Sequence, residues 1–388
     1  MSFKRLFSRS LGAAPDRLHM AAHSHHLWPD ASFDGQVQCW QDAARFADRK
    51  WDRVMGEVWP EAQAHVAAEL GGGAPNTIVF AGNTHDLLIR LFAACPRRRG
   101  GPLRVLTSDG EFHSSRRQFA RWEESGEAAV TRIATEPFAS FEQRFRGALD
   151  QNEYDLVLIS QVMFGSGRVL CDVAAITKRG RPDGPWVVID GYHSFMALDA
   201  PLGIAAANSA FFLGGGYKYA MAGEGCAFMH CPPGFGPRPP ITGWYAEFDE
   251  LDLEPGQVGY APDAMRFMGA TFDPSGLYRF NAVQLMLQGE GLTTPVISNH
   301  VRGLQQRLVD AIGGSPLGNA DLITPPAGAA PHARFLAWRT PCAADWCEAL
   351  MREGCVTDVR GDVLRVGLGL YHDEGDIDDF VKLARALN

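Results

Sequence analysis

The feature that most constrains this chain is an alternation between short, β-rich apolar runs and segments with helical periodicity. The apolar runs predict strands that are buried on both faces of a sheet. Strands that alternate with helices form parallel βαβ units, in which the helices cover both faces of the sheet. The alternation covers residues 77–81, 84–94, 103–107, 115–124, 156–160, 173–178, 186–190 and 210–213. We therefore predict an α/β fold around a mainly parallel sheet.

Helical segments precede and follow this region. Apolar and aromatic residues recur at helical spacing over residues 33–70, and three glycines follow. After Cys231, five prolines among glycines interrupt any regular element. Two further helical stretches then lead to strand-like segments and a terminal helix, at residues 277–288, 295–312, 334–339, 363–366 and 377–387. This pattern predicts a second, smaller α+β region.

Charge and cysteine content limit the partners of the chain. Its 36 Lys and Arg residues stand against 45 Asp and Glu residues, which gives a formal net charge of −9. This balance disfavours nucleic acids and anionic membranes and favours a small-molecule partner. No apolar run reaches the roughly 20 residues that cross a bilayer, and the eight cysteines contain no CxxC pair. We expect reduced thiols, no membrane insertion and a cytoplasmic location.

Two segments place a carboxylate and an amine where a parallel sheet binds its ligands. Asp190 ends an apolar strand, and ligands of open α/β sheets bind outside the carboxyl ends of the strands. Lys218 follows His193 by 25 residues and comes shortly after a strand and a glycine triplet. Pyridoxal 5'-phosphate (PLP) needs an amine to hold its aldehyde and an anion to keep its ring nitrogen protonated. Lys218 and Asp190 are therefore the candidate catalytic pair.

The same segments resemble a known family. The order Asp190-x-x-His193, then Tyr217-Lys218-Tyr219, then Ala-Gly-Glu-Gly at residues 222–225 is similar to the cofactor site of class V aminotransferases. Within that family the resemblance is closest to kynureninase. Further segments follow in the family's order over residues 22–380: Gly82-Asn83-Thr84, Glu111-Phe112-His113-Ser114, Ser160-Gln161-Val162, Gly243-Trp244-Tyr245 and the strand that carries Arg365. Each motif alone is unspecific, and their common order carries the resemblance.

The resemblance implies a PLP-dependent transferase fold of type I. It implies an N-terminal arm (residues 1–32) that joins the small domain, a large PLP-binding domain (33–262) and a small C-terminal domain (263–388). It also implies a homodimer with the site at the subunit interface. In such a dimer, Trp244 would reach the phosphate of the neighbouring subunit's cofactor.

The resemblance also implies which residues bind the cofactor. Asn83 and Thr84 precede an apolar helix, whose N-terminus suits a phosphate. Phe112 offers a flat face for stacking on the ring. Ser160 lies at a strand end on the other side of the ring, and His193 lies on the side of the phenolic oxygen. Without the family pattern, these residues would be interpreted as a helix cap, a core aromatic and a structural histidine.

Two residues have implied roles toward the substrate or the reaction. Tyr217, next to Lys218, contacts the phosphate and donates a proton in a kynureninase-like mechanism, although packing is the alternative role. Arg365 lies on a strand-like segment, where a planar guanidinium can hold the substrate's α-carboxylate through two hydrogen bonds.

The chain departs from kynureninase on the substrate side. Kynureninase has an Asn-Ser-Leu-Gly type motif where residues 22–29 read Ala-His-Ser-His-His-Leu-Trp-Pro, and it has an acid where Ser115 stands. The cofactor motifs are intact, so we expect an amino-acid substrate other than kynurenine.

The histidines of the N-terminal arm allow two interpretations. His23 and His25 can line the edge of the substrate pocket. Alternatively, His23, His25 and His26, with His19, can bind a metal in a hydrolase. The close spacing of these histidines lacks the His-x-x-x-His geometry of zinc hydrolases. We therefore predict substrate contacts and no metal.

The pattern favours a PLP-dependent enzyme that acts on an amino acid through an external aldimine. We favour kynureninase-like cleavage of the side chain over an aminotransferase reaction, which would move the amino group to a 2-oxo acid. A cysteine desulfurase is less favoured because Cys342, Cys347 and Cys355 lie in no recognisable catalytic loop. A PLP-binding regulator without activity is a further alternative, because a fold does not fix an activity.

Overall fold

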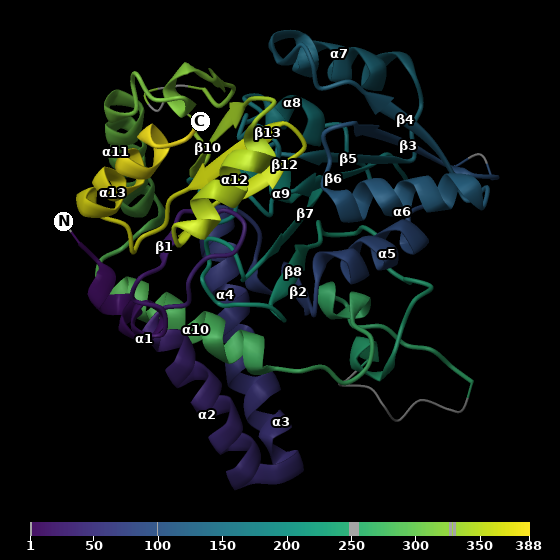
Figure 1. The fold of residues 1–388 in the computed structure, drawn as a ribbon. Coiled ribbons are helices and arrows are strands. Elements are labelled where there is room, and N and C mark those ends of the chain that lie inside the picture. The colour runs from purple at the N-terminus through teal and green to yellow at the C-terminus, as the bar shows by residue number, and fades with distance from the viewer. Residues whose placement is uncertain (1, 99, 248–255, 326–327, 329–330) are drawn as a thin grey trace.

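A seven-stranded sheet forms the centre of the computed structural model, which describes residues 2–98, 100–247, 256–325, 328 and 331–388. The strand order is β2-β8-β7-β6-β5-β3-β4 (Figure 1). The strands from β7 to β4 run parallel, and β8 runs antiparallel to both of its neighbours. The strands are β2 (Ile78–Ala81), β3 (Leu103–Ser108), β4 (Ala128–Ile133), β5 (Leu156–Ser160), β6 (Trp186–Asp190), β7 (Ala210–Gly215) and β8 (Ala227–His230).

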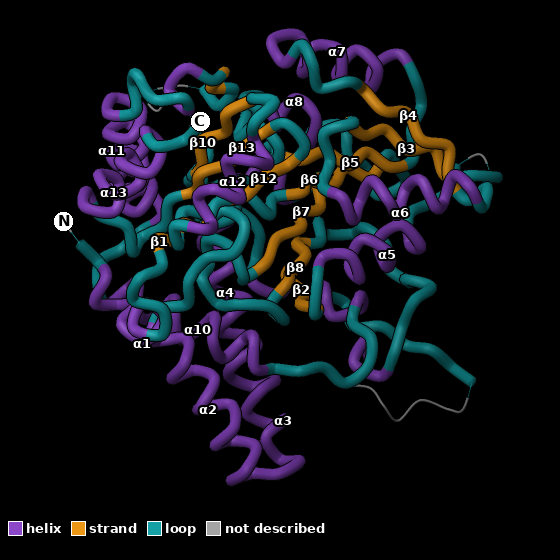
Figure 2. The backbone as a smooth tube through the Cα atoms, viewed as in Figure 1, coloured by secondary structure: helices purple, strands orange, loops and turns teal. Residues whose placement is uncertain are grey.

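The middle strands of this sheet are almost entirely buried. Every residue of β5 and β7 is buried, and Asp190 is the one partly exposed residue of β6. Parallel strands that helices cover on both faces form such continuous apolar runs. Helices flank the strands, as Figure 2 shows. These helices are α4 (Trp59–Leu70), α5 (Thr84–Ala94), α6 (His113–Glu124), α7 (Phe138–Gln151), α8 (Val173–Thr177) and α9 (Gly203–Ala207).

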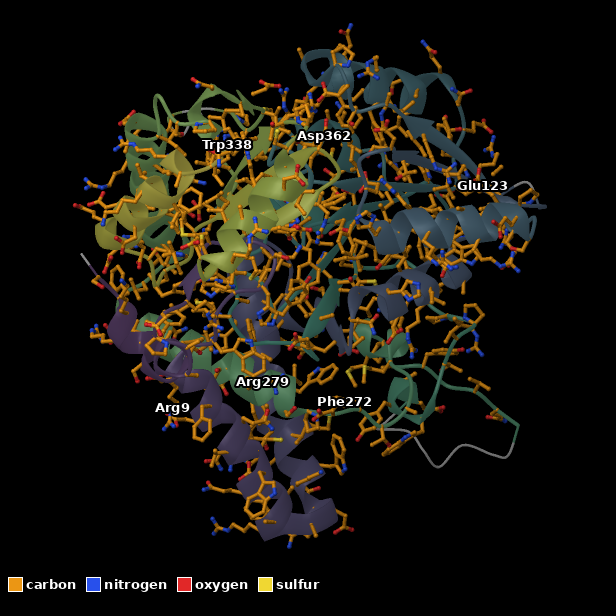
Figure 3. The ribbon with its side chains drawn as sticks, in the orientation of Figure 1. Arg9, Glu123, Phe272, Arg279, Trp338 and Asp362 are labelled. Carbon is orange, nitrogen blue, oxygen red and sulfur yellow. The ribbon has the colours of Figure 1, made fainter. Side chains whose placement is uncertain are left out.

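A second, antiparallel sheet follows in the C-terminal third. Its order is β12-β13-β10-β9, and Trp338 of β10 lies in it (Figure 3). Helices α11 and α13 pack against each other beside it. The elements are α10 (Ser275–Gly289), α11 (Thr294–Ala311), β9 (Asp321–Leu322), β10 (Phe335–Arg339), α12 (Ala343–Arg352), β11 (Cys355–Val356), β12 (Asp358–Arg360), β13 (Val363–Gly367) and α13 (Glu374–Arg385).

The N-terminal segment crosses the molecule and contacts the C-terminal third. After α1 (Ser8–Gly12), β1 (Leu18–His19) pairs in parallel with β11, and Ala21 bridges to Gly367. The chain then enters α2 (Asp30–Phe46) and α3 (Lys50–Arg53), and α2 packs along α10. Gly35 permits this close packing, because a Cβ there would lie 2.6 Å from the Tyr278 carbonyl oxygen. The pairing of β1 brings the arm histidines toward the second sheet.

The fold agrees with the architecture expected from the sequence. A mainly parallel sheet lies between helices, and a smaller α+β region follows it. The domain boundaries at residues 33 and 263 stay predictions. Within the described ranges, every helix is too short or too polar to span a bilayer.

Candidate active site

A cavity of about 1460 Å³ lies at the carboxyl ends of β5, β6 and β7. Segments that are far apart in the sequence line it together. Among the lining residues are these predicted cofactor residues: Asn83, Thr84, Phe112, Ser160, Asp190, His193, Tyr217 and Lys218. Ligands of open α/β sheets usually bind in a crevice outside the carboxyl ends of the strands.

Asp190 is the last residue of β6 and faces this cavity. In the sheet it lies between Ser160 of β5 and Leu213 of β7. Its Oδ1 accepts a hydrogen bond from the Tyr192 backbone N–H at 3.1 Å. Burial raises the pKa of Asp190, whereas this hydrogen bond and the charge of Lys218 lower it. A carboxylate at this place would suit the protonated ring nitrogen of a bound cofactor.

Lys218 is buried in the loop that follows β7. The glycines before it are needed for space, because a Cβ at Gly215 would lie 2.4 Å from the Tyr192 hydroxyl oxygen. Burial lowers the pKa of Lys218 to about 7, the Asp190 charge acts against this shift, and the Arg365 charge adds to it. An amine with this pKa is available as a nucleophile and as a base near neutral pH.

His193 connects Lys218 to a buried tyrosine. The Lys218 Nζ lies 2.7 Å from His193 Nε2, and the Tyr219 hydroxyl lies 3.5 Å from His193 Nδ1. Burial, followed by the charges of Lys218 and Arg365, lowers the pKa of His193 well below its ordinary value. The imidazole is therefore neutral at physiological pH, with one nitrogen able to donate and the other to accept.

Other residues of the lining are suited to a phosphate and an aromatic ring. Asn83 caps α5, and its side chain accepts a hydrogen bond from the Asp86 backbone N–H at 2.9 Å. The Thr84 side chain and the first turn of α5, which also carries Asp86, lie at a helix N-terminus in the cavity lining, where a phosphate would be stabilised. The Phe112 ring centroid lies 5.7 Å from Lys218 Nζ and 5.5 Å from the Phe164 ring.

These features fit PLP. A buried amine with a lowered pKa, an acid at a strand end, an anion site on a helix and an aromatic face line one cavity. Lys218 would hold the aldehyde, Asp190 the ring nitrogen, and Asn83 and Thr84 the phosphate. Phe112 would contact the ring.

Glu111 is a buried acid whose role the sequence did not show. Its two carboxylate oxygens accept hydrogen bonds from Ser108 Oγ and Ser160 Oγ, at 2.5 Å each. Burial raises the pKa of Glu111 to about 7, and the nearby Asp190 adds to the shift. The sequence signal for this buried acid was a Glu shortly after an apolar strand, three residues after a serine. Glu111 fixes Ser160, which lines the cavity.

Arg279 is a second residue that the sequence did not single out. It lies on α10 (Figure 3), and its Nε donates to the Ala222 carbonyl at 2.7 Å. Another of its nitrogens donates to the Glu224 carbonyl. Both acceptors belong to the loop that follows Lys218, so Arg279 positions that loop. An arginine within the largely apolar 277–288 segment was the sequence signal.

Arg365, the predicted carboxylate-binding residue, is held by an acid. It lies opposite Asp358 in the β12–β13 pairing, and its NH2 group donates to Asp358 Oδ2 at 2.7 Å. Another of its nitrogens donates to the Phe164 carbonyl. The side chain is buried and is not part of the cavity lining, although its charge acts on Lys218 and His193. Its Nε has no hydrogen-bond partner among the described residues.

The two predicted substrate histidines occupy different environments. His23 is fully buried and stacks on Phe335 at 4.6 Å. His25 is exposed; its Nε2 lies 3.1 Å from Glu224 Oε1, and its ring lies 6.0 Å from the Tyr217 ring. Because Glu224 and Tyr217 both line the cavity, His25 lies at its edge.

The two remaining histidines of the N-terminal arm form contacts elsewhere. The His19 Nδ1 lies 2.6 Å from the Tyr371 hydroxyl, and the His26 Nδ1 lies 2.7 Å from the Leu27 carbonyl. Across the described residues, no group of three His, Cys, Asp or Glu side chains is arranged to hold a metal ion. The four histidines therefore do not converge on one point.

Trp244 is a partly exposed residue outside the lining of this cavity. It begins a short 3-10 helix (Trp244–Glu247), is 43% exposed and packs on Tyr245 at a centroid distance of 4.1 Å. It is not among the lining residues. Its predicted contact with a neighbouring subunit's cofactor stays a prediction.

Comparison with solved structures identifies the fold of this chain. A C-DES mutant with glycine covalently linked to its PLP cofactor matches with a TM-score of 0.79 and 15% identity, covering 99% of each chain. The apo cysteine desulfurase from Thermococcus onnurineus NA1 matches with a TM-score of 0.78 and 15% identity over 100% of both chains. The Escherichia coli cysteine desulfurase CsdA matches with a TM-score of 0.77 and 15% identity, over 97% of this chain and 96% of that one. The chain has the type I fold of PLP-dependent transferases.

The type I fold confirms the predicted fold class and leaves the closer relationships open. No family model matches the sequence, and the comparison with curated proteins found no match. The resemblance to kynureninase stays a prediction, since the similar structures named above are a C-DES enzyme and two cysteine desulfurases. None of the eight cysteines lines the cavity of this type I fold.

Proposed function

We propose that the protein is a PLP-dependent enzyme that removes the Cα proton of an amino acid and then cleaves a bond of its side chain. The observation that carries this proposal is Lys218, a buried amine with a pKa of about 7 in the same cavity as Asp190. PLP, when bound, withdraws electrons from the substrate's Cα. The type I fold of C-DES, which a solved structure describes as a cystine C–S lyase, supports this reaction class.

Different side chains of the site would serve the different proton transfers of this reaction. Asp190 would hold a proton on the cofactor's ring nitrogen. Lys218 would hold the cofactor's aldehyde and would serve as the base for the Cα proton, since its pKa suits a base at neutral pH. The neutral His193 accepts a hydrogen bond from the Lys218 amine and orients it.

Tyr217 favours side-chain cleavage over transamination. It lines the cavity next to Lys218, and burial raises its pKa, so it keeps its proton at neutral pH. Cleavage needs a proton donor for the departing group in addition to the base at Cα, and Tyr217 can serve as that donor. Transamination can proceed with Lys218 alone and is the second candidate.

Desulfurase chemistry has less support from the site. A sulfur atom can move to the protein only if a thiolate reaches the substrate. Burial raises the pKa values of Cys226 and Cys355, and neither residue lines the cavity. A lyase that releases its sulfur product to solvent needs no such thiolate.

The first test is the covalent attachment of the cofactor. Borohydride reduction of the reconstituted protein should attach PLP to the peptide with Lys218, and Lys218→Ala should abolish attachment. An adduct mapped to another lysine would refute the proposal.

The second test separates cleavage from transamination. We expect mass spectrometry of reactions with β- and γ-substituted amino acids to find shortened carbon skeletons. Tyr217→Phe should lose at least about tenfold in cleavage rate and keep exchange of the Cα proton with deuterated water. Intact 2-oxo acids as the main products would establish the transaminase alternative.

We also propose a homodimer in which Trp244 contributes to the neighbouring site. The exposed position of Trp244, outside its own cavity, supports this arrangement. Light scattering should give twice the mass of the chain, and Trp244→Ala should release PLP more readily. A monomer that retains PLP fully would contradict it.

A further inference from the structure

A second cavity lies beside the candidate active site and has a different chemical character. Its volume is about 460 Å³, and it lies between the start of α6, the loop after β5 and the β12–β13 hairpin. It shares His113, Arg116 and Phe164 with the large cavity. The two cavities are therefore neighbours that border the same three residues. Asn83, Thr84 and Lys218 line the large cavity and not the second one.

The charged groups of this second cavity are mostly basic. Its lining contains Arg116, Arg339 and Arg360, against the single carboxylate of Glu136. Arg339, at the outer side, lies 4.0 Å from Glu136 and 3.8 Å from Asp362. Arg339 is thus already paired, which leaves Arg116 and Arg360 as the groups that can receive a ligand.

Arg116 and Arg360 have unused donors. The Arg116 side chain forms no hydrogen bond or ion pair within the described part of the chain, and it is exposed to both cavities. Arg360 lies 2.8 Å from Asp358, but Asp358 also pairs with Arg365 at 2.7 Å. One carboxylate thus serves two guanidinium groups, and one positive charge is left over. The Arg360 Nε is buried and has no partner among the described residues.

Much of the remaining lining is apolar, beside His113, Thr135 and Ser166. Phe138, Met163, Phe164, Val359 and Val363 contribute side chains to the same cavity. Such a space suits a hydrocarbon or aromatic body that ends in an anion, because burial of the body is favourable and arginine binds oxyanions through paired N–H groups.

We propose that the second cavity binds an acidic group at the end of the substrate's side chain, so that the substrate is an amino acid with a second carboxylate on an apolar or aromatic body. This inference rests on the proposed function. The anion cannot be the cofactor phosphate, whose candidate site at the N-terminus of α5 lies in the large cavity only. It cannot be the α-carboxylate either, since that group must stay next to the carbon from which Lys218 takes a proton, and Lys218 does not line the second cavity.

The test compares matched pairs of amino acids that differ in one acidic group. L-α-aminoadipate is paired with L-norleucine, and para-carboxy-L-phenylalanine with para-methyl-L-phenylalanine. The change in visible absorbance of the holoenzyme on titration gives each dissociation constant. We expect the acidic member of at least one pair to bind at least tenfold more tightly. Arg116→Ala and Arg360→Met should each reduce that preference to threefold or less.

Arg117→Ala is the matched control. Arg117 is an exposed neighbour on α6 that lines the large cavity only. Its substitution should leave the preference unchanged, even if the absolute affinities change. Equal or weaker binding of both acidic members would overturn the inference and leave the proposed function intact. A preference that survives in Arg116→Ala and in Arg360→Met would also overturn it.

A second measurement remains informative if the proposed function fails. If no amino acid changes the absorbance, the melting temperature of the full chain is compared in hexanoate and in its neutral amide, hexanamide. Hexanoate should then stabilise the wild type and Arg117→Ala more than hexanamide does, and Arg116→Ala should lose the difference. Equal melting temperatures in the two compounds would rule out the acidic subsite.

Discussion

The Lys218 Nζ lies 2.7 Å from the His193 Nε2, and both side chains are buried in the same cavity. Burial is the main cause that lowers the pKa of each group. At pH 7 the His193 imidazole is therefore neutral and the Lys218 amine is about half protonated. A free lysine would be protonated under the same conditions, because its pKa is about 10.4.

This pairing predicts the pH dependence of cofactor attachment. Only the uncharged amine attacks an aldehyde, so the rate of attachment should rise with pH and reach half its maximum near pH 7, the pKa of Lys218. Asp190 raises that pKa, so Asp190→Asn should move the midpoint to lower pH. The measurement is the rate of borohydride-trapped adduct in protein freed of PLP, with Lys218→Ala as the blank. A midpoint above pH 9 would contradict the buried amine.

The raised pKa of Glu111 predicts that the stability of the folded protein depends on pH. The pKa of Glu111 in the folded protein is about 7, above its ordinary value of 4.5, so the folded state binds the proton more tightly than the unfolded state does. The resulting stability is fully present below pH 4.5 and is lost as the pH rises to 7. Glu111→Gln cannot ionise. Between pH 5 and pH 7.5, its free energy of unfolding should therefore gain about 1–3 kcal/mol relative to the wild type.

Denaturant unfolding at the two pH values measures this gain. Glu124→Gln is the control, because the Glu124 side chain is 71% exposed and lies at the far end of α6. Glu111→Ala should instead destabilise the protein by about 1–3 kcal/mol at pH 5, since Ser108 and Ser160 lose their acceptor. Parallel curves for wild type and Glu111→Gln would show that Glu111 titrates normally.

Much of this fold follows from local sequence signals. The apolar runs that became β5, β6 and β7 are continuous, and continuous apolar runs are typical of buried parallel strands. Their order also placed Ser160, Asp190 and Lys218 at one edge of a sheet. In contrast, β4 has exposed residues along its length because it lies at the sheet edge, so its apolar signal is weak.

The partners of the site residues were harder to predict, because they depend on register and burial. Asp358 and Arg365 face each other only because residues 361 and 362 form a two-residue turn between β12 and β13. The Gly361-Asp362 pair was a usable hairpin signal for that register. No local pattern, however, shows that the Glu111 carboxylate is buried between two serines from different strand ends.

The contact between His25 and Glu224 predicts a small effect on stability and a larger one on binding. Both side chains are more than half exposed, at 51% and 66%, so their ion pair contributes at most about 1 kcal/mol to folding. Glu224 lines the cavity, and the pair lies at its edge. His25→Ala should therefore leave the melting temperature nearly unchanged and weaken amino-acid binding, measured by absorbance titration. Unchanged binding would remove His25 from the substrate site.

The bond between Asp358 and Arg365 leads to a prediction about carboxylate binding by Arg365. In the described structure the Arg365 guanidinium bonds to Asp358 Oδ2 at 2.7 Å, and both side chains are buried. Arg365 does not line the cavity, and a substrate carboxylate that reached it would compete with this acid for the same donors. Asp358→Asn removes the competing charge, so it should increase the binding preference for an amino acid over its carboxamide. Arg365→Met should abolish that preference, if the guanidinium is what receives the α-carboxylate.

The same substitution has a cost in stability. Loss of one partner of a buried pair destabilises a protein by about 3 kcal/mol, so Asp358→Asn should lower the free energy of unfolding. The Asp358 charge also raises the pKa of Lys218, and its removal should move the attachment midpoint below pH 7. A purely structural pair would show these two effects without any change in the preference for the carboxylate. If Arg365→Met keeps the preference for the carboxylate, then Arg365 supports the β12–β13 hairpin and another group binds the substrate.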